Sequence, residues 1–332
     1  MIEKKLLQLR NKSILAPYFT DFVAQKRALG YRYDTCVEVL NLFDDFCVEH
    51  KLNHPIISSE LMQEWCQMRP NENQTTQHMR ICYIQNFCTF LHNIGLEAPY
   101  AFHPLPKVSK KFKPYIFTEK EISDLIAVID DQHSSTIIGS PVRHLVYPVL
   151  FRVLCGCGLR INEALQLKTS DVDLDKGTFL IREAKGGKDR LIVLSDSLIQ
   201  ICRDYRSKTL IQEYGHDYFF PNPHHYFYDS KTIYADFRKY LRLCGINHQG
   251  RGYGPRLHDL RHTFAVRVLS KWQDQGKDIY LCLPILQVYL GHSKLSSTEH
   301  YLRLVPESYA QVTTPCENQF GYIFPEVHND KE

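Results

Sequence analysis

Three short segments in the second half of the chain carry side chains suited to chemistry on a phosphate. His258 and Arg261 stand in the run His-Asp-Leu-Arg, His292 follows Gly291, and Tyr301 comes a little later. Guanidinium and imidazole groups can donate hydrogen bonds to phosphate oxygens, and a tyrosine hydroxyl can act as a nucleophile. This order of residues predicts chemistry on a nucleic-acid backbone.

The local sequence indicates how helices would present these groups. A helix over residues 257–268 would place His258 and Arg261 on one face. Pro284 suits the first position of a following helix, and Gly291 suits the left-handed residue that closes it. Ser296 to Glu299 has the spacing of a capping box, so a new helix is expected to begin there and to carry the tyrosine one turn in.

Two further features lie upstream. Arg160 follows a glycine-containing break in an apolar helix and opens the next helix, with Glu163 three residues on. A cation at that end favours a bound anion, although a simple surface pair between the two residues is the alternative. Residues 178–182 and 190–194 are rich in strand formers and flank Lys185-Gly-Gly-Lys188, which predicts a hairpin whose lysine either contacts a ligand or is merely solvated.

Each of these motifs alone has an ordinary structural explanation, such as core packing, but their order along one chain resembles a known family. The matching runs are Cys-Gly-Leu-Arg-Ile-Asn-Glu, Ala-Lys-Gly-Gly-Lys-Asp-Arg, His-Asp-Leu-Arg-His-Thr-Phe-Ala, Leu-Gly-His-Ser and Thr-Glu-His-Tyr. Together they resemble the tyrosine recombinases, also called the phage integrase family, over the C-terminal two-thirds of the chain.

The resemblance implies site-specific DNA recombination by strand transfer. The hydroxyl of Tyr301 would attack a DNA phosphate, leaving a 3′-phosphotyrosyl link and a free 5′-hydroxyl. Another strand's 5′-hydroxyl then reverses the step on a new partner, so the reaction uses no ATP, metal or other cofactor. The implied catalytic residues, with Glu163 in support, are Arg160, Lys185, His258, Arg261, His292 and Tyr301.

The residue types fit the demands of that reaction. Arginines stay protonated and donate paired hydrogen bonds to the charge that develops on the phosphate oxygens, and His292 adds a donor. A phenol has a pKa of about 10, so a base is needed, for which His258 is the candidate. By resemblance Lys185 protonates the leaving 5′-oxygen. Ala184 stands where the family often has glycine, so Lys188 remains an alternative for that role.

A metal site is a weaker interpretation. His258 and His262 have the spacing of zinc-protease ligands, but Asp259 stands where those enzymes have a catalytic glutamate, and no third ligand is evident. We therefore expect no metal.

Composition and patterning predict two domains in a mainly α protein with a small β-sheet, an α+β catalytic domain. With 332 residues, 44% of them hydrophobic, the chain can bury two cores. The expected parts are an N-terminal helical domain over 1–102, built of about four helices, a basic Pro/Lys linker over 103–116, a larger domain over 117–313 and a tail over 314–332. The resemblance implies that the first is a core-binding domain of the SAM-like type and that the second is the catalytic domain. By resemblance the two domains form a C-shaped clamp around the duplex, and no further basic module is expected ahead of residue 14.

The expected partners follow from the same resemblance. They are double-stranded DNA with paired recombination sites, a homotetramer in the synaptic complex and accessory recombination proteins, with the apolar tail docking on its own domain or on a neighbouring protomer. A net charge of +3 is modest for a DNA-binding protein, so the basic contacts must be local. The residues expected to contact DNA are Lys107, Lys110, Lys111, Lys113 and Lys188.

The location of the protein is predicted from its cysteines and hydropathy. Eleven cysteines without a regular framework, and no signal peptide, predict reduced thiols in the cytoplasm. The resemblance implies a bacterial protein located at the nucleoid. No membrane segment is expected. Two other functions remain open: strand relaxation like that of type IB topoisomerases, and non-catalytic DNA binding by a regulator of the same fold, which would need no Tyr301.

Overall fold

The computed structural model describes residues 6–99, 114–131, 143–184, 188–208, 217–222, 226–248 and 254–304, without the side chains of residues 183, 184 and 188. The chain divides into two compact units, residues 1–112 and 113–332. Several predictions fall outside the described residues: the tail over 314–332 and the side chains of Lys107, Lys110, Lys111, Lys113, Lys185 and Lys188. These stay predictions, as do the domain assignments.

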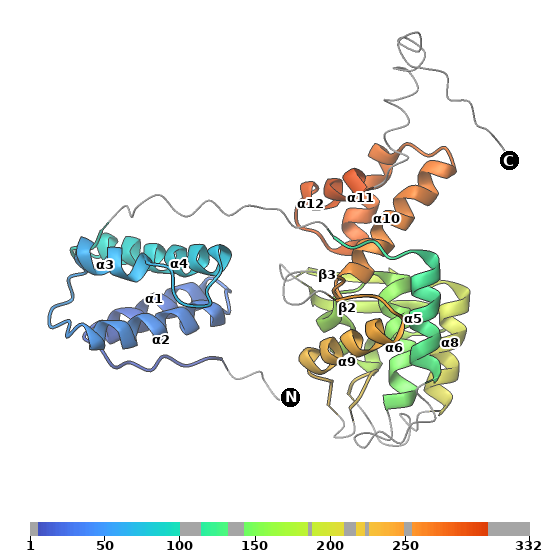
Figure 1. Ribbon diagram of the computed structural model, residues 1–332, viewed down its shortest axis with the longest axis horizontal. Coiled ribbons are helices and arrows are strands. Elements are labelled where there is room, and N and C mark those ends of the chain that lie inside the picture. The colour runs from blue at the N-terminus through green and yellow to red at the C-terminus, as the bar shows by residue number, and fades with distance from the viewer. Residues whose placement is uncertain are drawn as a thin grey trace, which may run out of the picture. The chain divides into compact units, whose positions relative to one another are not determined.

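The first unit is helical in its described part and contains the four helices expected from the sequence. They are α1 (Ala16–Ala28), α2 (Asp34–Glu49), α3 (Ser59–Cys66) and α4 (Gln74–Asn93) (Figure 1). Ser58 and Asn73 cap α3 and α4 by accepting hydrogen bonds from backbone amides of the first turn. Aromatic side chains from all four helices, such as Phe19, Phe43 and Trp65, fill the core.

The second unit combines eight described α-helices with one small sheet. The helices are α5 (Glu119–Asp131), α6 (Arg143–Cys157), α7 (Ile161–Leu165), α8 (Asp196–Lys208), α9 (Ser230–Leu243), α10 (Asp259–Asp274), α11 (Ile279–Leu290) and α12 (Ser296–Glu299), with short 3-10 turns at Thr169–Asp171 and His300–Leu304. The sheet is antiparallel, in the order β1 (Val172–Asp173), β2 (Thr178–Ala184) and β3 (Lys188–Val193). The predicted fold class, mainly α with a small sheet, is confirmed.

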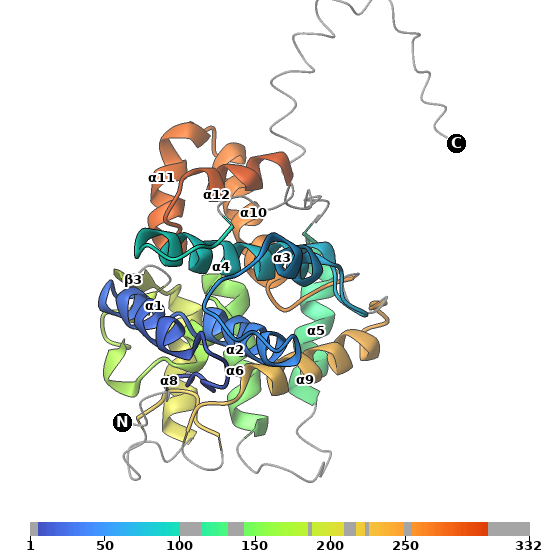
Figure 2. The same ribbon diagram turned by 90° about the vertical axis from the view of Figure 1, so that its left-hand side faces the viewer.

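The apolar helix α6 forms the centre of the second unit. It packs against α5, α8 and α10, and its Leu150 and Phe151 are fully buried. Both ribbon views show α10, α11 and α12 together at one end of this unit (Figures 1 and 2). The predicted hairpin is present as β2 and β3. Helix α10 contacts α6, α11 and the 3-10 turn that carries Tyr301, and α11 contacts α12. These segments therefore lie together in one region of the second unit.

Two local predictions are wrong. Pro284 is not the first residue of its helix but lies inside α11, because Asp278 caps that helix by accepting hydrogen bonds from the amides of Tyr280 and Leu281. The capping box expected at Ser296 is not formed either, since Ser296 is already helical and the N-cap residue is Leu295. Among the described helices, none is long and apolar enough to cross a membrane.

Candidate active site

Arg160 lies at the start of α7, just after the chain reverses at the end of α6. Gly158 makes the turn with a positive φ of 59°, and a Cβ there would approach Phe264 Cδ1 to 2.5 Å. Arg160 then adopts an extended conformation as the N-cap residue. Its backbone amide donates to Glu163 Oε2 at 3.0 Å and its Nη1 donates to Glu163 Oε1 at 2.6 Å. The predicted pairing with Glu163 is therefore present, but its carboxylate is buried instead of lying on the surface.

Arg261, in the first turn of α10, is 1% exposed. Its Nη1 donates to the carbonyl of Gly158 at 2.9 Å and its Nη2 to the carbonyl of Leu290 at 2.6 Å. Burial, together with the neighbouring charge of Arg160, lowers the pKa of Arg261 to about 10, which still leaves the guanidinium protonated at neutral pH. The side chain thus joins the turn after α6 to the end of α11 and keeps its charge.

Gly291 closes α11 in the left-handed conformation predicted from the sequence, with φ 66° and ψ 48°. Its carbonyl oxygen accepts a hydrogen bond of 3.2 Å from Nη2 of Arg160. The next residue, His292, has its Nδ1 2.9 Å from the hydroxyl of Thr298, which is fully buried in α12. The imidazole of His292 is therefore held in one orientation beside the two arginines.

Tyr301 lies in the 3-10 turn that follows α12 and is 2% exposed. Burial raises the pKa of its phenol above the ordinary value, while the charge of Arg261, a hydrogen bond with that guanidinium and the charge of Arg160 act in the opposite direction. The ring centroids of His262 and His292 lie 5.5 and 6.1 Å from the tyrosine ring. The phenol is thus surrounded by cations and imidazoles.

The three histidines near the arginines are all held in the neutral form. Burial, followed by the charge of Arg261, lowers the pKa of His258 and His292 to about 4 each. Burial lowers the pKa of His262 to about 3, and its ring lies 4.8 Å from that of His258. Among the described residues, no three His, Cys, Asp or Glu side chains form a group able to hold a metal ion.

Arg190 also belongs to this site, although none of the sequence motifs includes it as a site residue. It lies on β3 and donates to both oxygens of Glu163, with Nη2 2.7 Å from Oε2. Burial alone would raise the pKa of Glu163, but hydrogen bonds and charge from Arg190, with help from Arg160, lower it below the ordinary value. In the sequence, Arg190 reads as one polar position of a strand, because its partner lies in a different segment.

The structure brings most of the predicted residues into one place. The residues that meet are Arg160, Glu163, His258, Arg261, His292 and Tyr301. They come from α7, α10, the turn after α11 and the 3-10 turn after α12, and they act on one another electrostatically. Lys185 lies outside the described residues. This constellation combines two guanidiniums, neutral imidazoles and a buried phenol, which are groups able to donate hydrogen bonds to an anion and to supply a nucleophile.

The model of the phage integrase family matches residues 116–307. The chain belongs to the phage integrase family. "Putative integrase/recombinase y4rB" of Sinorhizobium fredii is 30% identical over 294 residues, covering 86% of this chain and 92% of that protein. Tyrosine recombinase XerA of Pyrococcus horikoshii is 31% identical over 224 residues, covering 67% of each chain.

A solved structure of the XerH site-specific recombinase, in a post-cleavage complex with a palindromic difH substrate, shares the fold. Its TM-score is 0.63 at 17% identity, with 93% of this chain and 92% of that chain covered. The predicted family, tyrosine recombinase, and the predicted class of function, site-specific DNA recombination, are confirmed by these matches.

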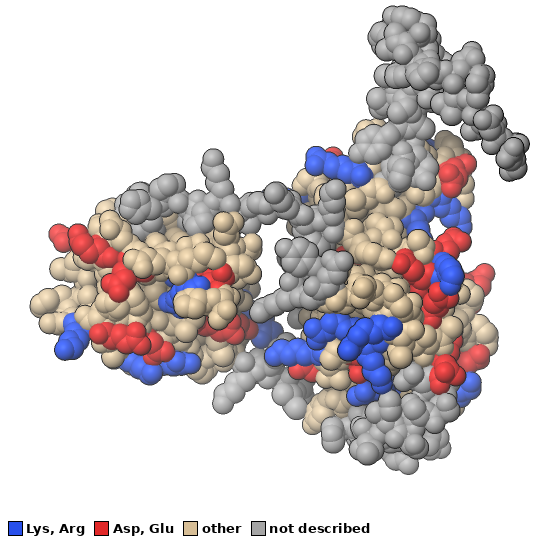
Figure 3. All heavy atoms as spheres, viewed as in Figure 1, with Lys and Arg blue, Asp and Glu red and all other residues tan. Residues whose placement is uncertain are grey.

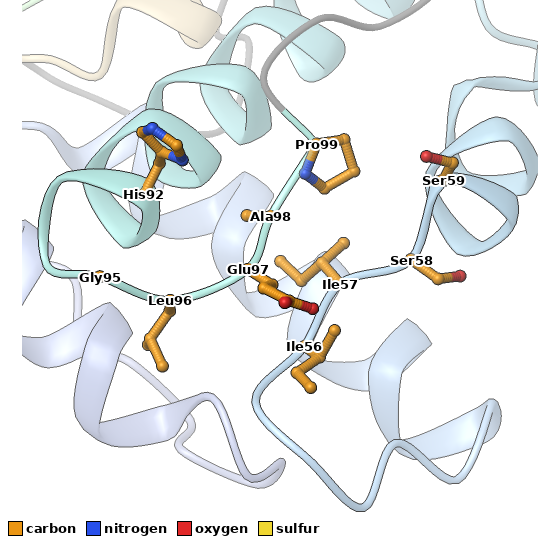
Figure 4. Close-up of a pocket in the computed structure, with 10 residues that line it drawn as sticks. All are labelled: Ile56, Ile57, Ser58, Ser59, His92, Gly95, Leu96, Glu97, Ala98 and Pro99. Carbon is orange, nitrogen blue, oxygen red and sulfur yellow. The ribbon is translucent and has the colours of Figure 1, made fainter.

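A separate hollow lies on the first unit and has no part in this site. It has a volume of about 580 Å³ and lies between the start of α3 and the segment after α4. Figure 4 shows His92 on α4, Ser58 and Ser59 at the start of α3, and Glu97 and Pro99 on the segment that follows α4. These side chains belong to another unit than the arginine cluster, so we assign them no catalytic role.

Proposed function

We propose that this recombinase cleaves DNA through Tyr301. The phenol oxygen attacks the scissile phosphorus, the bond to the 5′-oxygen breaks, and the protein stays joined to the 3′-phosphate. Attack by a 5′-hydroxyl on that phosphotyrosine reverses the step on a new strand. One phosphoester is exchanged for another at each step, so we propose that the enzyme needs neither ATP nor a metal. The observation that carries the proposal is that the phenol of Tyr301 is buried among the charges of Arg261 and Arg160 and the rings of His262 and His292.

In this proposal Arg160 and Arg261 bind the non-bridging oxygens of the scissile phosphate. Both guanidiniums are held by backbone carbonyls of the same region, Arg160 by that of Gly291 and Arg261 by those of Gly158 and Leu290. Fixed donors of this kind lose little energy to reorganisation when charge develops in the transition state. His292, oriented by Thr298, adds a further donor to the phosphate.

Proton transfer needs a base and an acid. A neutral imidazole can accept the phenol proton, and the low pKa of His258 keeps it in that form. A bound phosphate would offset the positive charge of the arginines and raise the pKa of His258, which makes it a better base when substrate is present. For the leaving 5′-oxygen we propose Lys185 as the acid, with Lys188 as the alternative.

We propose that both units contact double-stranded DNA, as two arms of a clamp, with the lysines of the linker along its backbone. In the second unit, α9 exposes Lys231, Arg238 and Arg242 on one face. Figure 3 shows Lys and Arg side chains gathered over this helix. A local basic surface of this kind supports DNA binding by a chain of modest net charge. Replacing Arg238 and Arg242 with glutamine should weaken DNA binding and reduce its salt dependence.

We further propose a homotetramer at two paired sites, assisted by accessory proteins at the bacterial nucleoid. Exposed apolar side chains on α11, at Leu281, Ile285 and Val288, are between 64% and 74% exposed and offer a surface for a partner. The apolar tail over 314–332 is the segment we expect to dock between protomers. If deletion of residues 314–332 leaves pairing of two DNA sites unchanged, this part of the proposal is wrong.

The reaction is tested with a nicked duplex taken from the DNA that flanks the protein's own gene, since such a substrate traps the covalent intermediate. Wild-type protein should form a protein–DNA adduct, and Tyr301→Phe should form none while binding DNA normally. An equal adduct with the phenylalanine variant would identify another nucleophile. Relaxation of a supercoiled plasmid without joining of two sites would favour the topoisomerase-like alternative.

A further inference from the structure

Arg190 is the most extensively bonded side chain around the site, although it faces no open part of it. Its side chain is 6% exposed. Nε donates to the carbonyl of Tyr289 at 2.9 Å, and Nη1 and Nη2 donate to Glu163 Oε1 and Oε2 at 3.2 and 2.7 Å. One guanidinium therefore links β3 to α7 and to the last turn of α11.

The carboxylate that Arg190 binds is the one that orients Arg160. Each oxygen of Glu163 accepts one bond from Arg190 and one from Arg160, either from Nη1 or from the backbone amide. A planar carboxylate gripped at both oxygens has little freedom to rotate. Arg190 thus fixes Glu163, and Glu163 in turn fixes Arg160.

Arg190 also supports the opposite side of the site. A Cβ placed on Gly291 would come within 2.9 Å of Nη1 and 3.1 Å of Cζ of Arg190, so this turn lies directly against the guanidinium. The carbonyl of Gly291 is the second acceptor for Arg160. Both anchor points of Arg160 are therefore held by the same buried residue.

The charges point to the same role. Glu163 lies near three guanidiniums, since Arg261 Nη1 is 3.9 Å from its Oε2. Arg190 supplies two of the four hydrogen bonds to this carboxylate and a full positive charge beside it, so Nη2 of Arg160 and the charge of Arg261 stay available to a phosphate. Without Arg190, Glu163 would draw both of them away from the substrate and partly cancel their charge.

We infer that Arg190 is a positioning residue, which acts on the scissile phosphate through Glu163 and Arg160 without touching the phosphate itself. The inference rests on the proposed function. Arg182 provides a matched control, because it lies on the neighbouring strand β2 and also pairs with a buried carboxylate, that of Asp171, while its own side chain is 55% exposed. Arg182 has no bond to the site residues in the described structure.

The test is single-turnover cleavage of the nicked duplex by full-length protein at saturating concentration. We expect Arg190→Met to slow cleavage by roughly 100-fold, since a displacement of about 1 Å has that effect, while DNA affinity changes less than about 3-fold. Arg182→Met should cleave at the wild-type rate. Arg190→Lys keeps the charge but not the paired bonds, so it should fall between wild type and Arg190→Met, and it serves as the test variant if the methionine protein does not fold.

A second substrate separates positioning from a general structural defect. A methylphosphonate at the scissile position replaces one non-bridging oxygen by an uncharged methyl group, in either of two diastereomers. For each diastereomer, the cleavage rate of a variant is compared with that of wild type. On the diastereomer for which Arg160→Met reduces this rate least, Arg190→Met should also reduce it less than it does on the ordinary phosphate. The double variant should be hardly slower than Arg160→Met alone, because both changes remove one function.

The inference is overturned if the Arg190 variants cleave as fast as Arg182→Met, if their loss is the same on all substrates, or if the losses at positions 160 and 190 multiply. These outcomes all presuppose an adduct with wild-type protein that Tyr301→Phe does not form. If that difference is missing, the proposed function itself fails, and the inference fails with it.

Discussion

A hydrogen bond of 3.2 Å joins Nη2 of Arg160 to the carbonyl of Gly291, across 131 residues of sequence. Arg261 makes the complementary connection, since it bonds to the carbonyls of Gly158 and Leu290. Two arginines thus hold together the turn after α6 and the end of α11, between which a phosphate would lie. The same side chains serve the fold and the proposed chemistry, so changes in the two turns should affect both.

Gly158→Ala should destabilise the protein more than Gly245→Ala. Both glycines have positive φ, 59° and 71°, but a Cβ at 158 would approach the ring of Phe264 to 2.5 Å, whereas at 245 nothing lies within 4 Å. Strain of the left-handed conformation alone costs about 1–2 kcal/mol, and overpacking adds roughly 1–3 kcal/mol. Urea unfolding of the two variants measures the difference. Equal losses would mean that the ring of Phe264 moves aside freely.

Arg261→Lys should abolish most of the cleavage activity although it preserves the charge. Lysine cannot reach two carbonyls and a phosphate with one ammonium group. We expect the cleavage rate to fall by roughly 10²–10³-fold, the typical effect of removing one fixed donor from a transition state. Arg160→Lys, at a side chain 22% exposed, should disturb the free energy of unfolding less. Single-turnover rates and urea unfolding distinguish the two effects, and a wild-type rate for Arg261→Lys would refute the role given to it.

Thr298→Val should slow cleavage without unfolding the protein. Valine fills the same buried space but removes the hydroxyl that lies 2.9 Å from Nδ1 of His292. A lost hydrogen bond of about 1 kcal/mol corresponds to a roughly 5-fold change in rate if it acts only on the orientation of the imidazole. Thr89→Val is a suitable control, since Thr89 bonds only within α4 of the first unit in the described structure. No change at position 298 would show that His292 is oriented by other contacts.

The apparent second-order rate of DNA cleavage should begin to fall only at a pH well below the ordinary pKa of histidine. His258 must be neutral to accept the phenol proton, and its pKa in the free protein is lowered to about 4 by burial and by Arg261. A base with an unshifted pKa of about 6.5 would be roughly 97% protonated at pH 5, and the apparent second-order rate of cleavage would drop about 30-fold. We expect a much smaller drop between pH 7.5 and pH 5.

The sign of the shift gives a control for this prediction. Arg160 is one of the charges that lower the pKa of His258. Arg160→Gln removes a positive neighbour, so protonation becomes easier, the pKa rises, and the acid limb of the residual activity moves to higher pH. A limb that stays in place in this variant, or that lies near pH 6.5 in the wild type, would argue against His258 as the base.

Much of the site could be predicted from the sequence because its parts obey local rules. The sequence predicts that Gly291 closes a helix because few other residues adopt a left-handed conformation, and it predicts β2 and β3 from their strand formers around two glycines. The lack of an amide proton predicts Pro284 at the start of a helix. The helix begins further upstream, however, because the side chain of Asp278 caps it.

The role of Arg190 could not be predicted in this way. Its bonds reach Glu163 and Tyr289, 27 and 99 residues away in the sequence. Nothing local distinguishes it from Arg182 on the partner strand, which has its own acidic partner. Only the packing of β3 against α7 and α11 shows which of the two arginines supports the site.

The most direct test of the account is to locate the covalent bond to DNA. After reaction with the nicked duplex, trypsin and nuclease digestion should leave a nucleotide on the peptide Leu295–Arg303, in which Tyr301 is the one tyrosine. Tandem mass spectrometry is expected to place the nucleotide, joined through its 3′-phosphate, on the Tyr301 oxygen. The same modification on another residue, in a protein that recombines its DNA normally, would contradict the central claim.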